Sequence, residues 1–293
     1  MGKFVQLVVD GLSTGSVYGA IALAIVLVNQ ATGLINFAQG GMAVLAAYVA
    51  WWLTTDGVPL VLAILLSILF SFVLGAVIER WLMRRFERGD PDTAVVVTIG
   101  LLTLITGICG WLWTYNNQQF PSLFPLDTVS FLGVSISVRS IGTTLVIVVA
   151  MILLQVLFVR TKLGLALRAV AINPQSAAFS GLPVGRLFMV GWGLAAALGA
   201  VAGALVAPQL TLTPGMLDNT LVYALAAVIL GGLTSPIGAV VAAWIIGVLE
   251  NLAAVYVPFI GFDLKVAVPF ILIFVVLIVR PQGLFGRKVV VRV

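Results

Sequence analysis

The sequence contains no histidine and only one cysteine, Cys109, among its 293 residues. The lack of histidine removes the commonest metal ligand and the side chain that most readily exchanges protons near neutral pH. A single cysteine excludes an intrachain disulfide, and because Cys109 lies in an apolar run we expect a buried, inert thiol. No G-x-x-x-x-G-K-[ST] segment occurs, so no phosphate-binding loop of that kind is present. We therefore predict no catalytic residues, no metal site and no cofactor bound by this chain.

Charge is equally scarce. Charged residues make up 9% of the chain and hydrophobic residues 62%, with a mean hydropathy of +1.22, whereas soluble domains average about 25% charged residues. The uncharged runs exceed the ~20 residues that a helix needs to cross a bilayer. The short alternating segments of transmembrane strands are absent. The predicted fold class is an all-α polytopic membrane protein, folded as a single domain over residues 1–293.

The basic residues show a strong positional bias. Most of the 15 lysines and arginines abut the ends of apolar runs, which is the pattern of cytoplasmic loops. This bias accounts for the sequence pI of about 9.7 without a nucleic-acid partner. Counting crossings from these clusters places the C-terminus in the cytoplasm and the N-terminus outside. The three clusters are Arg80, Arg84, Arg85 and Arg88; Arg160, Lys162, Arg168 and Arg186; and Arg280, Arg287, Lys288 and Arg292.

The apolar runs predict eight to nine membrane segments, some of them broken or half-length. Residues 11–55 carry no charge and are long enough for two spans, divided near 29–33. The N-terminal stretch is predicted to be a retained first span, because Asp10 interrupts its apolar run. Residues 219–257 must enter and leave again, so their short first limb, 219–230, is predicted to be half-length or re-entrant. The other spans are expected at about 58–78, 93–114, 140–159, 187–207 and 264–280, with an external loop at 115–139.

Two interruptions divide apolar hairpins: "GLINFAQGG" at 33–41, which contains glycines, and "GGLTSPIG" at 231–238, which contains glycines and a proline. Paired interruptions in the two halves of a chain point to a substrate pathway, since bent backbone at membrane depth must be buried or line a cavity. The alternative is close helix packing through small residues. The candidate pathway residues are Asn36, Phe37, Gln39, Gly40, Gly231, Gly232, Thr234, Ser235, Pro236 and Glu250.

Glu250 is the carboxylate that falls inside a predicted span. An intramembrane carboxylate is costly and is by default a functional candidate. The structural alternative is a hydrogen-bonded or paired group, although the sequence shows no matching buried base. Lys265 is expected at the outer surface, where its long side chain can reach water.

Residues 160–186 form the predicted cytoplasmic loop, and they contain a helix with a start and a stop. Asn173 is a good N-cap and Pro174 suits the first helical position. Gly181 suits the left-handed residue after the helix, and Pro183 prevents continuation. The enclosed helix, 174–180, is too short to be stable alone. It either docks on a partner or is simply a helical turn in a surface loop.

Five segments in order resemble the LivH-type permease, a membrane subunit of branched-chain amino acid ABC importers. They are GLSTGSVYGAIAL (11–23), GLINFAQGGMAVLAAYV (33–49), GLALRAVAINPQSAAFSGL (164–182), VILGGLTSPIGAVVAAWIIGVLE (228–250) and RPQGLFG (280–286). The family usually has a histidine and an acidic residue where this chain has Gln39 and Gly41. Loop 115–139 is not matched.

The resemblance implies a fold similar to that of type II ABC importer permeases, the vitamin B12 importer class, and a site in the bacterial inner membrane. It implies a second permease subunit (a related chain or a second copy), two ATPase subunits that hold ATP and magnesium, and an extracytoplasmic solute-binding protein. The solute would be small and polar: a branched-chain or other amino acid, urea or an amide. The implied ATPase-coupling residues are Asn173, Pro174, Gln175, Ser176, Ala177, Ala178, Phe179, Ser180 and Gly181.

A self-contained secondary transporter or channel is the alternative function, favoured by the broken helices and disfavoured by the scarcity of buried ionisable groups. A membrane enzyme would need a catalytic constellation that the sequence lacks. Copurification of an ATPase distinguishes the first two functions.

Overall fold

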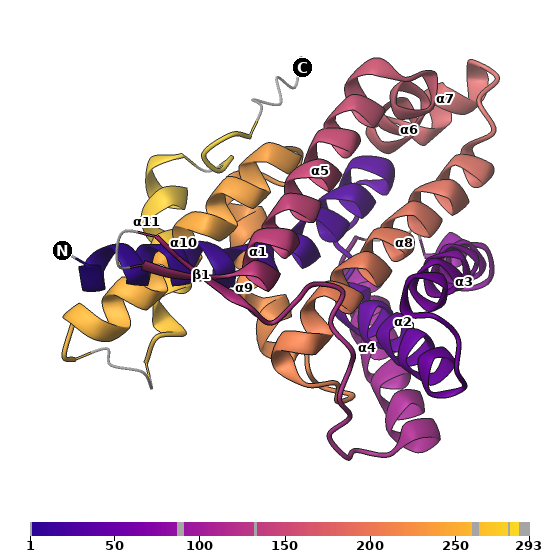
Figure 1. Ribbon diagram of the computed structural model, residues 1–293. Coiled ribbons are helices and arrows are strands. Elements are labelled where there is room, and N and C mark those ends of the chain that lie inside the picture. Colours follow the sequence, from indigo (N-terminus) through magenta and orange to yellow (C-terminus); the bar gives the residue numbers. More distant parts are fainter. Residues whose placement is uncertain (1, 87–90, 132–133, 260–263, 281, 287–293) are drawn as a thin grey trace. The chain divides into compact units, whose positions relative to one another are not determined.

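The computed structural model describes residues 2–86, 91–131, 134–259, 264–280 and 282–286 (Figure 1). Arg88, Arg287, Lys288 and Arg292 of the basic clusters lie outside these residues. The chain forms two compact units, each assembled from distant segments. Unit 1 comprises Met1–Val26, Phe124–Ile152 and Val222–Val293, and unit 2 comprises Leu27–Leu123 and Leu153–Leu221. The single permease domain expected for residues 1–293 stays a prediction.

The described residues confirm an all-α membrane protein. Six of their helices are long and apolar enough to cross a membrane, and two further apolar helices are shorter. The long helices are α1 (Gly2–Thr32), α3 (Leu60–Trp81), α4 (Pro91–Trp113), α5 (Val138–Arg160), α8 (Val184–Leu210) and α10 (Pro236–Tyr256). The shorter ones are α9 (Asp218–Gly231) and α11 (Ala267–Val279), and the remaining helices are α2 (Gln39–Thr55), η1 (Met83–Arg85), α6 (Lys162–Ile172) and α7 (Pro174–Phe179).

In unit 1, helix α1 packs on α10 through glycines. A Cβ atom at Gly11 would lie 2.5 Å from the Cα of Val248, and one at Gly15 would lie 2.7 Å from the Cα of Trp244. Small residues let membrane helices approach this closely, which increases the dispersion contacts between them. The hydroxyl of Ser16 adds a polar link, because it accepts a hydrogen bond from Nε1 of Trp244 at 2.9 Å.

The external loop predicted at 115–139 contains a hairpin that the sequence did not predict. Strand β1 (Thr128–Phe131) pairs antiparallel with β2 (Val134–Ser137), with Thr128 opposite Ser137. Gln6 of α1 brackets the second strand: its amide accepts from the backbone N–H of Ser135 and donates to the carbonyl of the same residue, both at 2.9 Å. Such short strands carry little signal of their own, and this pair is stabilised by a residue far away in the sequence.

In unit 2, helices α3 and α8 lie side by side (Figure 1). A Cβ atom at Gly75 would lie 2.6 Å from the carbonyl oxygen of Trp192, and one at Gly193 would lie 2.9 Å from the carbonyl oxygen of Phe72. The two helices are therefore in backbone contact on both sides of the same crossing. A pair packed this closely should move as one body.

Candidate functional site

Helix α7 has the caps that the sequence predicted. The Oδ1 atom of Asn173 accepts a hydrogen bond from the backbone N–H of Ser176 at 2.9 Å, and Pro174 occupies the first turn. At the other end Gly181 has a φ of +81°. Its N–H donates to Ala178 and the next N–H donates to Ala177, which is the paired bonding of a Schellman stop. The helix ends one residue earlier than predicted, at Phe179.

Helix α7 exposes nearly all of its residues. Ala177 is buried and holds the helix to its unit, whereas Pro174, Gln175, Ser176, Ala178 and Phe179 are exposed. Among the large apolar residues that the structure describes, Phe179 is the most exposed, at 92%. Helix α7 is thus capped at both ends and presents an aromatic side chain outward.

A second helix that the sequence did not single out, α6, precedes α7 and lies beside it (Figure 1). Leu167 and Val170 of α6 are fully buried, whereas Ile172 at its end is 85% exposed. The exposed apolar surface of α7 is thus extended by Ile172. Asn173 alone separates the two helices, and the sequence analysis predicted only the second of them.

The first interruption, in unit 2, is an unwound segment held by two buried amides. Asn36 and Gln39 are both fully buried. The Oδ1 of Asn36 accepts from the backbone N–H two residues on at 2.9 Å, and the Nε2 of Gln39 donates to the carbonyl of Ala195 on α8 at 2.9 Å. The N–H of Phe37 donates to the hydroxyl of Thr98 at 3.3 Å. Asn36 and Thr98 thus satisfy backbone N–H groups between α1 and α2, and Gln39 ties the start of α2 to α8.

Gln39 also explains a glycine on α8. A Cβ atom at Gly199 would collide with the Gln39 amide nitrogen. A Cβ atom at Gly40 would lie 3.5 Å from the side chain of Leu221. Four predicted pathway residues, Asn36, Phe37, Gln39 and Gly40, therefore come together at one place, where the amides have partners inside the unit.

The second interruption, in unit 1, separates α9 from α10. The hydroxyl of Ser235 accepts from the N–H of Gly238 at 3.0 Å, and Pro236 follows at the first helical position, so these two residues start α10. Gly231 and Gly238 lie against each other without room for a Cβ atom. Thr234 is exposed at the turn.

The segment after α11 is joined to the end of α9 by backbone hydrogen bonds. The N–H of Leu284 donates to the carbonyl of Leu230 at 2.8 Å, and the N–H of Phe285 donates to Gly231 at 3.1 Å. These carbonyls belong to the last turn of α9, where no intrahelical donor is available. Gly232, with a φ of +103°, brings its backbone next to Gly286. The small residues at this break thus admit a second backbone, a role that the sequence pattern alone did not show.

Glu250 is held within a polar cluster in unit 1, and its side chain is 1% exposed. The hydroxyl of Tyr18 donates to its Oε2 at 2.9 Å, and the Nζ of Lys265 lies 3.2 Å from its Oε1. The ring of Tyr18 stacks on that of Tyr223 with centroids 4.5 Å apart. The sequence showed no matching buried base for Glu250, and its ionic partner is the partly exposed Lys265, which the turn before α11 brings back to α10.

The sequence analysis did not predict the pair formed by Glu79 and Arg84. It used Arg84 only as a member of a basic cluster that indicates the cytoplasmic side. Both Oε atoms of the fully buried Glu79 accept from the guanidinium of Arg84, at 3.1 and 2.9 Å. Arg84 also donates to the carbonyl of Gly185 at 2.8 Å. A spacing of five residues is not a helical pair. The two side chains meet here because α3 ends between them and η1 turns Arg84 back towards Glu79.

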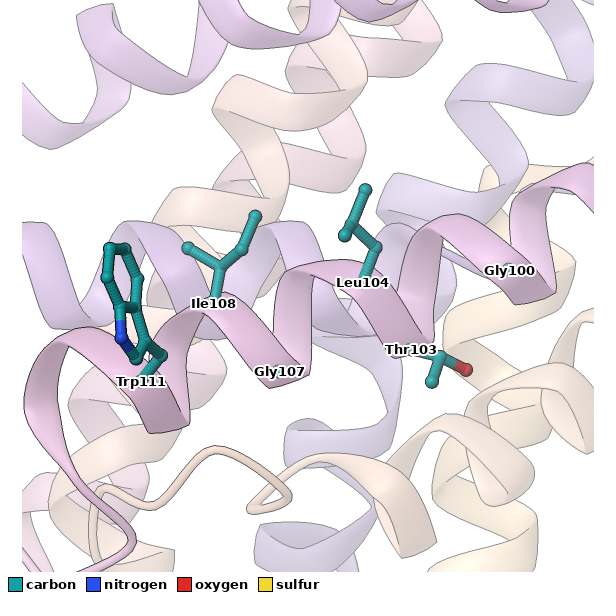
Figure 2. Close-up of a pocket in the computed structure, with 6 residues that line it drawn as sticks. All are labelled: Gly100, Thr103, Leu104, Gly107, Ile108 and Trp111. Atoms are coloured by element: carbon teal, nitrogen blue, oxygen red, sulfur yellow. The ribbon is translucent and has the colours of Figure 1, made fainter.

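Figure 2 shows a shallow groove along one face of α4, lined by Gly100, Thr103, Leu104, Gly107, Ile108 and Trp111. It contains none of the predicted site residues. Within the described part of the chain, no group of three or more His, Cys, Asp or Glu side chains is placed to hold a metal ion.

Comparison with known proteins gives matches over nearly the whole chain. The family described as "Branched-chain amino acid transport system / permease component" matches residues 7–277. The high-affinity branched-chain amino acid transport system permease protein BraD of Pseudomonas aeruginosa is 30% identical, over 99% of this chain and 98% of that protein. The corresponding protein LivH of Escherichia coli K12 is 26% identical over the same shares. In the solved structure "PsaBC from Streptococcus pneumoniae in complex with Fab", one chain matches at 17% identity with a TM-score of 0.45, covering 94% of this chain and 91% of that one.

Proposed function

This chain belongs to the family of permease components of branched-chain amino acid transport systems, and from that membership we propose how it contacts its partners and its solute. It is the non-catalytic, multi-pass transmembrane subunit of an ABC transport system. Such a subunit works with ATPase and binding-protein partners. The partner set we propose is a second permease subunit, two ATPase subunits and an extracytoplasmic solute-binding protein, in the bacterial inner membrane.

We propose that residues 173–181 are the coupling helix that docks on an ATPase subunit. The exposed face of α7 carries this proposal, with Phe179 92% exposed although it is a large apolar side chain. An apolar ring in water costs free energy that burial in a partner recovers, about 1.5–3 kcal/mol for phenylalanine. The caps supply the local order that so short a helix would otherwise lack.

The proposed orientation follows from the basic residues at helix ends. Arg84 and Arg85 follow α3, Arg160 ends α5, and Arg280 follows α11, so these ends are placed in the cytoplasm. Counting from them, nine helices (α1–α5 and α8–α11) act as membrane segments and the N-terminus lies outside. Helix α9, with 14 residues, is about 21 Å long at 1.5 Å per residue, which is short for a hydrocarbon core of ~30 Å.

The proposed solute is a branched-chain amino acid. The relatives that match this chain over almost their full length are named for branched-chain amino acid transport. We assign the two interruptions and Glu250 to the pathway as its supporting layer. The buried amides of Asn36 and Gln39 hold the bent backbone of the first interruption, and Ser235 and Pro236 hold that of the second.

Copurification and uptake test the proposed function. The tagged permease, expressed together with the proposed partner subunits, should retain an ATPase subunit. It should support uptake of labelled leucine into right-side-out or reconstituted vesicles that contain ATP. The purified chain alone should hydrolyse no ATP, because it has no phosphate-binding loop. Leucine uptake that persists without any ATPase subunit would support the self-contained transporter instead.

Replacing Glu250 with glutamine should leave the complex intact and lower uptake by no more than about threefold. The Tyr18 hydroxyl can still donate to the amide oxygen. Lys265, with 43% of its side chain exposed, can turn to water at a cost below about 0.7 kcal/mol, the equivalent of threefold. The measurement is uptake per assembled complex, with Glu250→Ala as the harsher variant. Complete loss of uptake in an intact Glu250→Gln complex would place the carboxylate in direct contact with the solute.

A further inference from the structure

The structure assigns a second role to Arg84. We propose that the Glu79–Arg84 pair is the positioning clamp through which displacement of the coupling segment 173–181 reaches the membrane helices α3 and α8. This proposal rests on the proposed function, because it needs α7 to be the element that the ATPase moves. Arg84 is a positioning residue, since it contacts the element that follows α7 rather than the solute.

The clamp joins α3, η1 and α8 of unit 2 through the guanidinium of Arg84, which lies on η1. Two of its hydrogen bonds go to Glu79 on α3, and the third goes to the carbonyl of Gly185 in the first turn of α8. Both partners of Arg84, Glu79 and Gly185, have a feature that favours this contact. Glu79 is fully buried, so its charge depends on Arg84 for compensation. A Cβ atom at Gly185 would lie 3.1 Å from the guanidinium carbon, so glycine is the residue that admits the close approach.

The clamp is close to α7 along the chain. After the Schellman stop at Gly181, the connection to α8 is a tight turn in which the N–H of Val184 donates to Leu182 at 2.9 Å and the N–H of Leu187 donates to Pro183 at 3.1 Å. A turn this short and hydrogen-bonded transmits displacement rather than absorbing it. The next residue that it reaches, Gly185, is the one that Arg84 binds.

Beyond the clamp, α3 and α8 are in backbone contact at Gly75 and Gly193. Without Arg84, a push on the start of α8 could bend its first turn while the α3–α8 crossing stayed in place. With Arg84 bound to Glu79, the same push acts on the end of α3 as well. The pair therefore makes the first turn of α8 and the last turn of α3 respond together.

The experiment compares Arg84→Lys and Glu79→Gln with Arg85→Gln in the complete transport complex. Arg84→Lys keeps the charge but cannot make three hydrogen bonds in the same fork, and Glu79→Gln keeps the size but loses the paired charge. Arg85 is the matched control: it lies on the same turn η1, is exposed, and its side chain makes no hydrogen bond or ion pair with the described residues. The readouts are retention of the ATPase subunit, leucine uptake per assembled complex, and hydrogen exchange at the amides of 185–187.

We expect both clamp variants to retain the ATPase subunit, because 173–181 are unchanged. Uptake per assembled complex should fall about tenfold, which corresponds to about 1.4 kcal/mol of lost coupling, and exchange at 185–187 should be faster. Arg85→Gln should stay within twofold of the unmodified complex. Unchanged uptake per complex in both clamp variants would overturn the proposal, and so would an equal loss of uptake in Arg85→Gln. Failure of both clamp variants to assemble would also overturn it, because the pair would then be needed for folding.

A failure of the proposed function looks different. In that case Ala178→Asp would retain the ATPase subunit and normal uptake, or the unmodified permease would copurify with no ATPase at all. The clamp alone fails when Ala178→Asp releases the ATPase while the Arg84 and Glu79 variants couple normally.

Discussion

Replacing Phe179 with alanine, or Ala178 with aspartate, is expected to release the ATPase subunit from the complex while the permease stays folded in the membrane. Both side chains are exposed on α7, so neither change removes a contact within the chain. The alanine variant forfeits the burial of a phenylalanine ring in the partner, about 1.5–3 kcal/mol, or roughly ten- to hundredfold in affinity. The aspartate variant places an unpaired charge in a contact that excludes water.

The controls for this prediction are matched in chemistry. Phe259→Ala removes another exposed phenylalanine, 87% exposed, in the turn after α10 that the proposed orientation places outside. Ser130→Asp adds a charge on the exposed strand β1. Both should retain the ATPase subunit on copurification and transport normally. If the two α7 variants behave as these controls do, residues 173–181 are not the coupling helix.

The sequence predicted the parts of this protein that depend on local chemistry. The position of α7 follows from Asn173, Pro174 and Gly181, whose backbone preferences need no distant partner. The spans likewise follow from uncharged runs, because a bilayer imposes a length on every crossing helix. The start of α10 at Ser235 and Pro236 belongs to the same class.

The features that escaped prediction depend on residues far apart in the sequence. Lys265 reaches Glu250 only because a turn folds back on α10, and Gln6 stabilises β2 although it lies 129 residues away in the sequence. Arg84 has the same charge as its neighbours Arg80 and Arg85, and the burial of Glu79 beside it distinguishes it. Composition and spacing report which groups are present, whereas the pairing of these groups is decided by how the helices pack.

The glycine-rich break at 231–238 shows the same distinction. The pattern indicated bent backbone, and the structure adds the reason for the glycines, which is contact with the backbone of 282–286. The N–H groups of Leu284 and Phe285 satisfy the last carbonyls of α9, and that contact requires the space of a missing Cβ atom at Gly232. The sequence analysis offered close packing through small residues as the alternative to a substrate pathway. Close packing applies to this segment where it contacts residues 282–286.

Replacing Gly232 with valine should destabilise the permease strongly, because two costs coincide there. The residue has a φ of +103°, which costs a β-branched side chain about 1–2 kcal/mol or more, and its Cβ atom would lie 2.7 Å from the backbone nitrogen of Gly286, an overlap worth about 1–3 kcal/mol. The thermal midpoint of the detergent-solubilised complex, followed by tryptophan fluorescence, should fall by roughly 5–10 °C. Gly57→Val is the matched control, with a φ of +89° and nothing within 4 Å of the added Cβ atom, so it bears the strain without the collision. Equal shifts in the two variants would mean that the contact between Gly232 and the segment 282–286 contributes nothing to stability.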